Sequence, residues 1–81
     1  MKEYDILPGI AGRRYGVINP ISPHVAEHID TLIERNVDQI TIRKHKATDG
    51  FFVELAETRL RMHGWQQWGM DNNVWIKGAG Q

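Results

Sequence analysis

The stretch that decides the fold is SPHVAEHIDTLIERNVDQITIRKH, residues 22–45, because it joins the clearest helix of the chain to a clear strand. At about 100° per residue, one side of its first half is apolar, formed by Val25, Ala26, Ile29, Leu32 and Ile33. Ser22 suits the N-cap, Pro23 the first helical position and Asn36 the stop. The sequence therefore predicts a helix over residues 23–35.

Strand patterns lie on both sides of this helix. After it, VDQITIRKH (37–45) is rich in β-branched residues, and its apolar residues alternate with polar ones. Before it, residues 13–18 have the pattern of a short strand, which Asn19-Pro20 ends because the residue before a proline avoids the helical region. A strand–helix–strand unit favours a parallel pair of strands joined by a right-handed crossover.

Residues 50–63 allow two interpretations. Asp49-Gly50 is a hairpin signal, but in that hairpin Ile40 and Ile42 would face charged side chains. Arranged as a helix, the segment places its apolar residues on one broad arc, namely Phe51, Phe52, Val53, Leu55, Ala56, Leu60 and Met62. We expect the helix, with Gly64 as its end.

The tail predicts a C-terminal β-hairpin with arms at 65–68 and 74–77 and turn residues at 71–73. Breakers such as Pro8 and Gly9 indicate a loose lead-in over 1–12, and we expect residues 78–81 to fray. The fold class is therefore α+β: a small mixed sheet, element order β-α-β-α-β-β, with two amphipathic helices on one face.

Composition indicates one small domain, residues 1–81, that lacks a strong charge. The 81 residues carry ten basic and ten acidic side chains, which argues mildly against a dedicated nucleic-acid binder. The chain has no cysteine, so packing alone must stabilise it. No apolar run has the length of a signal peptide or a membrane span, so we expect a soluble, cytoplasmic protein without a membrane partner.

HVAEH, residues 24–28, has the H-x-x-E-H pattern of the inverzincin zinc peptidases. His24 and His28 are one helical turn apart, as two zinc ligands would be, with Glu27 beside them. No motif marks a third ligand, and a chain of this length offers little room for a substrate cleft. We therefore expect no metal site, with His24 and His28 as the only candidates, and we expect the two histidines to be solvated.

The densest basic stretch, which includes Arg43, Lys44 and Lys46, leads out of the second strand, and Arg13-Arg14 is a second basic group. Basic side chains neutralise phosphates, and exposed aromatic rings stack on unpaired bases. Together with the hairpin tryptophans, these five cations make nucleic-acid binding the alternative function. The alternative interpretation is that the basic stretch after the strand is an ordinary solvated loop.

Tryptophan is over-represented among the energetic hot spots of protein interfaces, which makes Trp65, Trp68 and Trp75 candidate protein-binding residues. Strand side chains alternate, so Trp65 and Trp68 point to opposite faces of a regular strand. Either a partner or a second copy covers the resulting aromatic face, or residues 1–12 fold across it. The sequence leaves these alternatives open.

Apart from HVAEH, the sequence contains none of the common catalytic or nucleotide-binding motifs, and we expect neither an enzyme nor a bound cofactor. We interpret the chain as a small accessory protein that acts through protein–protein contacts, with self-association as an additional expectation. A bacterial or phage regulatory factor is an interpretation from the small size alone.

Overall fold

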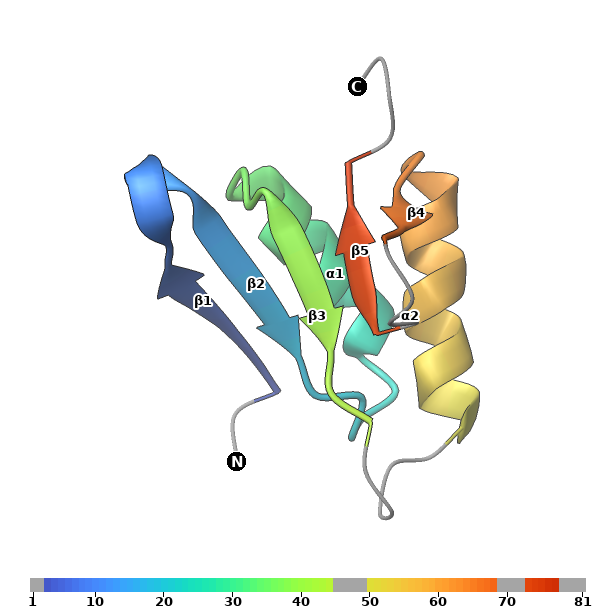
Figure 1. Cartoon of the computed structure of the whole chain (residues 1–81). Helices are drawn as coiled ribbons and strands as arrows, with labels where there is room; N and C mark the ends of the chain where they lie inside the picture. The colour runs from blue at the N-terminus through green and yellow to red at the C-terminus, as the bar shows by residue number, and fades with distance from the viewer. Residues whose placement is uncertain (1–2, 45–49, 69–72, 78–81) are drawn as a thin grey trace.

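The computed structural model describes residues 3–44, 50–68 and 73–77 of the chain. In chain order the elements are β1 (Tyr4–Pro8), the short 3-10 helix η1 (Ile10–Gly12), β2 (Arg14–Ile18), α1 (Val25–Glu34), β3 (Gln39–Ile42), α2 (Gly50–Met62), β4 (Gln66–Gln67) and β5 (Val74–Ile76). Residues 50–62 are thus helical, and the expected α+β class with a C-terminal β-hairpin is confirmed (Figure 1).

Within the described part of the chain, five strands form one mixed sheet in the order β1-β2-β3-β5-β4. β2 and β3 pair in parallel, with Gly16 opposite Ile40 and Ile18 opposite Ile42, and α1 connects them. All other pairs are antiparallel. The parallel pair predicted from the strand–helix–strand pattern therefore lies at the middle of the sheet.

The N-terminal segment differs from the expected loose lead-in, because residues 4–8 form β1 beside β2. The irregular backbone is confined to the connection between β1 and β2. There, Ala11 and Gly12 have positive φ, and the N–H of Gly9 donates to the carbonyl of Arg13 at 2.7 Å. Apolar residues of β1 pack against the core, which holds the strand in the sheet. Residues 4–8 thus extend the sheet and do not fold across it.

Both helices lie on the same side of the sheet, behind the strands in Figure 1. Side chains from both helices and from β2, β3 and β5 meet in one core, which consists of Ile18, Val25, Ile29, Leu32, Val37, Ile40, Ile42, Ala56, Leu60, Trp65 and Trp75. A Cβ at Gly16 would lie 3.2 Å from Leu32 Cδ1, so the glycine allows α1 to approach the sheet closely.

The predicted capping residues lie near the helix ends, but the N-cap of α1 is His24 and the prediction of Ser22 at that position was wrong. Ser22 Oγ accepts a hydrogen bond from the N–H of His24 at 3.0 Å, although regular helix begins only at Val25. Asn36 and Gly64 adopt positive φ after α1 and α2, the usual conformation of a residue that ends a helix. Within the described residues, no helix has both the length and the apolar character needed to cross a bilayer.

The turn after α2 also places a tryptophan in the core. The N–H of Trp65 reaches back to the carbonyl of Leu60 at 3.0 Å, and the N–H of Gly64 reaches that of Arg61 at 3.0 Å. This pair of bonds is the Schellman arrangement, which reverses the chain direction sharply. Trp65 is consequently buried at the start of the terminal hairpin.

Candidate functional site

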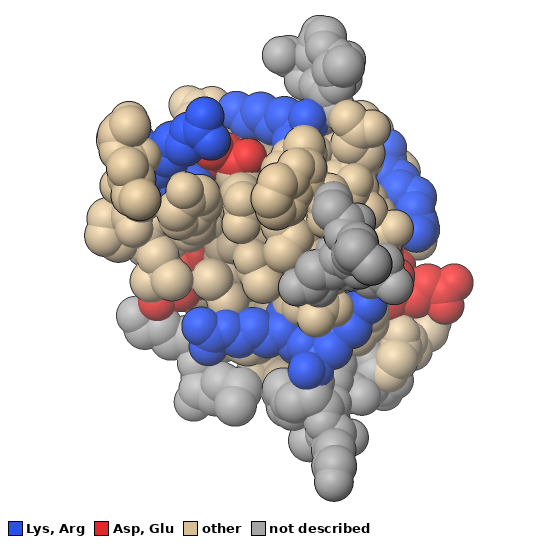
Figure 2. Space-filling view, in the orientation of Figure 1, with Lys and Arg blue, Asp and Glu red and all other residues tan. Residues whose placement is uncertain are grey.

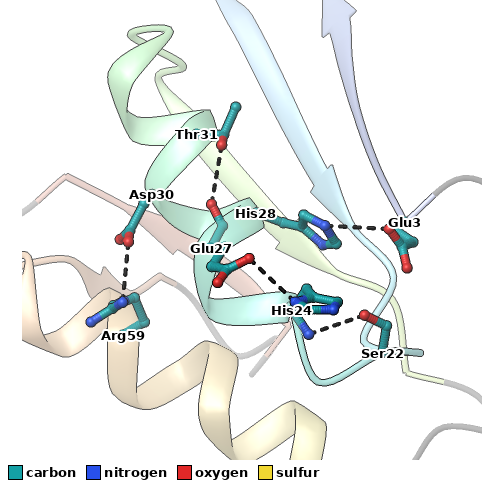
Figure 3. A network of polar contacts seen from close by, with 8 residues as sticks. All are labelled: Glu3, Ser22, His24, Glu27, His28, Asp30, Thr31 and Arg59. Atoms are coloured by element: carbon teal, nitrogen blue, oxygen red, sulfur yellow. Dashed lines mark hydrogen bonds and ion pairs between the residues drawn. The ribbon is translucent and has the colours of Figure 1, made fainter.

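The two histidines of HVAEH point to different partners (Figure 3). His24 Nδ1 lies 3.3 Å from Glu27 Oε2, whereas His28 Nε2 lies 3.3 Å from Glu3 Oε2. The His28 ring also packs on Tyr4, with ring centroids 5.1 Å apart. Across residues 3–44, 50–68 and 73–77, no group of three or more potential metal ligands gathers. Only the His28 contacts connect α1 to the residues around β1, because the His24–Glu27 pair lies within one turn at the start of α1. The side chain of His28 is 15% exposed, so the expectation that both histidines are solvated is wrong for His28.

Asp30 joins the two helices. Its carboxylate lies 3.1 Å from Arg59 Nη2 and 2.9 Å from His63 Nε2, and both partners come from α2 or its end. All three side chains are partly exposed, which limits such a pair to about 1 kcal/mol of stability. Arg59 of α2 therefore has a structural contact to α1.

The three tryptophans divide between the core and the surface. Trp65 and Trp75 are 5% and 1% exposed, so their rings contribute to the core. Trp68 is 57% exposed, and its backbone N–H donates to the carbonyl of Val74 at 3.0 Å, which continues the β4–β5 pairing. Side-chain alternation places Trp68 on the face away from the helices. Of the three predicted protein-binding residues, only Trp68 therefore presents its ring to solvent.

The sheet face opposite the helices carries a broad apolar surface, which we call the open face. Paired residues share a side, so the register assembles this surface around the buried Val17 from Leu7, Tyr15, Val74, Ile76 and Trp68, with Asp5, Gln39, Thr41 and Gln66 between them. None of the described helices covers it, and Figure 2 shows a largely uncharged centre. Leu7 at 39% and Trp68 at 57% are its most exposed large apolar side chains.

The basic residues predicted for nucleic-acid binding lie at opposite ends of the sheet. β2 and β3 are parallel, so Arg13 and Arg14 lie near one end and Arg43 and Lys44 near the other, about 20 Å away for six residues of strand. Figure 2 accordingly shows basic side chains above and below the uncharged centre. Lys46 lies outside the described residues.

Two of these cations are already engaged. Arg14 Nη1 donates to the carbonyl of Arg35 at 2.7 Å, at the end of α1. Lys44 Nζ lies 3.4 Å from Glu57 Oε2 on α2. Arg13 and Arg43 are exposed, and no ion pair to another described residue is found for either. Near each end of the sheet, an exposed arginine thus has no ion pair to another described residue.

The free edge of β1 is poorly suited to pairing with another strand. Gly9 bonds to Arg13 and Glu3 to Asn19, so by alternation the backbone groups of residues 4, 6 and 8 point away from β2. Pro8 has no N–H, and the outward N–H of Ile6 donates to Asp5 Oδ1 at 2.9 Å. Proline and a competing carboxylate are common protections of an edge strand. The open face is therefore a better candidate for binding than this edge.

A second apolar surface, which sequence reasoning missed, lies on the outside of the helices. A groove of about 420 Å³ is lined by Ala26, Phe51, Glu54, Leu55, Thr58, Arg59 and Met62. Phe51 and Met62 are 63% and 71% exposed. The sequence carried the signal, since the apolar arc of α2 spans about 200°, twice the width of an ordinary core-facing stripe. One half of the arc enters the core and the other half forms this helix groove.

Comparisons of the chain with protein-family models, with curated proteins and with solved structures gave no match. The functional argument therefore rests on the surfaces themselves.

Proposed function

We propose that this chain is a non-enzymatic binding protein that binds an apolar segment of another protein across the open face. The observation that supports this most strongly is Trp68, 57% exposed on a sheet face that the described helices leave uncovered. Natural proteins seldom expose a contiguous apolar surface without using it for binding. Tryptophan is also one of the residues most over-represented among interface hot spots.

The charges around the open face indicate the chemistry of the partner. Its centre is apolar and its two ends carry Arg13 and Arg43, which are exposed. Complementary charges favour the correct partner and raise its association rate. The proposed ligand is therefore a segment whose apolar residues contact Trp68 and its neighbours, with aspartate or glutamate on either side.

Nucleic-acid binding is the second candidate, because basic side chains and two exposed or half-exposed aromatic residues share the open face. Three observations make it the weaker one. The chain has no net positive charge, and Arg14 and Lys44 are engaged in contacts within the fold. Most of the apolar side chains on this face are aliphatic, and only Tyr15 and Trp68 could stack on bases.

Selection from a random peptide display library tests the proposal, with wild-type chain, Trp68→Ala and Phe51→Ala as three separate baits. Phe51 is the matched control, because it is a similarly exposed aromatic residue on the opposite side of the molecule. We expect wild type and Phe51→Ala to enrich apolar peptides with acidic flanks, and Trp68→Ala to lose them.

Enriched peptides that still bind Trp68→Ala would place the binding site elsewhere. Titration with mixed single-stranded oligonucleotides, followed by tryptophan fluorescence at two salt concentrations, tests the alternative. A saturable signal that weakens steeply with salt would favour nucleic acid over protein.

A further inference from the structure

We infer that the helix groove is a self-association surface, through which two copies pack their α2 helices antiparallel about a two-fold axis. This inference is independent of the proposed function, which uses the opposite face. It starts from the outer half of the apolar arc of α2. Phe51, Leu55, Thr58 and Met62 follow one another at intervals of four, three and four residues, the spacing of an interhelical seam.

The seam is complementary to its own two-fold image. The two-fold axis passes between the two α2 helices at the level midway between Ala56 and Glu57. It brings residue 51 opposite residue 62 of the second copy, and residue 55 opposite residue 58. Each pairing joins a larger side chain to a smaller or more flexible one. Phe51 meets Met62, and sulfur beside an aromatic ring is a favourable contact. Leu55 meets Thr58, which is small enough to receive it.

The charges beside the seam agree with the same arrangement. A two-fold axis perpendicular to antiparallel helices brings the same flank of each helix together at opposite heights. One flank of α2 carries Glu54 and, two turns further on, Arg61, and both are exposed. In the dimer, Glu54 of each copy therefore lies near Arg61 of the other. In a parallel packing, Glu54 would lie beside Glu54 of the second copy and Arg61 beside Arg61, so both contacts would join like charges.

The open face is less suited to self-association. Two open faces could stack about a two-fold axis that runs along the strands. Because β3 lies in the middle of the sheet, this arrangement would place Arg43 beside Arg43 of the second copy, which is a like-charge contact. An axis across the strands instead brings the basic end of one sheet over the basic end of the other. The helix groove therefore receives the second copy and leaves both open faces on the outside of the dimer.

The dimer should be weak. α2 has 13 residues, so a helix-to-helix contact is about 20 Å long and buries roughly 400 Å² per copy, half of a standard interface. We therefore expect a weak, transient dimer that dissociates on dilution. Two open faces on one dimer would still raise the apparent affinity for a partner that presents two binding segments, since the second contact becomes intramolecular.

Sedimentation equilibrium of the wild-type chain from 10 μM to 1 mM tests the inference, together with Phe51→Glu and Met62→Lys. We expect the wild-type mass to rise from 9.3 kDa toward twice that value. Each variant alone should stay monomeric, because a buried charge would meet Met62 or Phe51. Both positions are exposed, and each new charge favours the helix terminus beside it, so folding should persist by circular dichroism.

An equimolar mixture of Phe51→Glu and Met62→Lys decides the geometry. In a mixed dimer, the new glutamate and lysine face each other at one end of the seam, and Phe51 and Met62 keep their contact at the other. We expect the mixture to associate at least tenfold more tightly than either variant alone. A monomeric wild type at 1 mM, a dimer that both substitutions leave intact, or a mixture that stays monomeric would each overturn the inference.

Discussion

Two of the tryptophans of the terminal hairpin, Trp68 and Trp75, lead to a sharp prediction about stability. Trp75 is 1% exposed, on the helix-facing side of β5, and its ring packs under the guanidinium of Arg61 at 5.3 Å. Trp68 is 57% exposed on the other face. Replacing each by alanine removes the same atoms from the chain, so the difference between the two variants measures only their environments.

The magnitudes follow from burial. Truncating a fully buried tryptophan costs about 3–5 kcal/mol, and a domain of this length has a total stability of about 4–12 kcal/mol. Trp68 buries less than half of its surface, about 80 Å², which sets an upper limit of about 2 kcal/mol for Trp68→Ala. We therefore expect Trp75→Ala to be at least about 2 kcal/mol less stable than Trp68→Ala.

Urea unfolding followed by far-ultraviolet circular dichroism measures this difference without relying on tryptophan emission. With a denaturant slope of about 1 kcal/mol per molar, the midpoint of Trp75→Ala should lie about 2 M or more below that of Trp68→Ala. Equal midpoints, or a lower midpoint for Trp68→Ala, would refute the assignment of these two rings to the core and the surface.

Three further predictions test other parts of the structure. Acrylamide should quench one of the three tryptophans readily, and Trp68→Phe should remove that fraction of the emission; readily quenched emission in Trp68→Phe would contradict the burial of Trp65 and Trp75. Gly16→Val should cost about 1–3 kcal/mol in urea unfolding, because the added methyl groups collide with Leu32 and Ile40; a neutral change would mean that α1 lies further from the sheet. Asp30→Ala should cost about 1 kcal/mol because it removes the contacts to Arg59 and His63, and a double-mutant cycle with Arg59→Ala should show the coupling that independent sites would lack.

Much of the fold could be predicted from local patterns. The apolar period of residues 25–33 and the stop at Asn36 predict α1 within two residues of its observed bounds. For residues 50–62, the hairpin alternative failed because it paired Ile40 and Ile42 with charged residues, and this conflict correctly indicated α2. Where pattern, capping and pairing agree, the local sequence is a reliable guide to structure.

The first strand shows why the rest could not be predicted. Pro8, Gly9 and Gly12 dominate residues 1–12 and predict an irregular segment, but they occupy only the end of β1 and the turn that follows. The pairing of residues 4–8 with β2 depends on a neighbour that local sequence does not reveal. Edge strands of this kind are stabilised by tertiary contacts more than by their own propensity.

The candidate surfaces were predictable only in part. Alternation along the hairpin implies that Trp65 and Trp68 point to opposite faces, but which face is covered depends on the packing of both helices. The helix groove was visible in the sequence as an arc too broad for one buried stripe. Assigning its outer half required knowing which side of α2 contacts the sheet.

The most direct test of the proposed function is the affinity of one selected acidic-flanked peptide for three forms of the chain, measured by isothermal titration calorimetry. If Trp68 is a hot spot, Trp68→Ala should weaken the affinity for the peptide by about 30-fold or more, equivalent to about 2 kcal/mol. Phe51→Ala should change this affinity less than about threefold. Equal affinities for wild type and Trp68→Ala, or a loss confined to Phe51→Ala, would contradict binding at the open face.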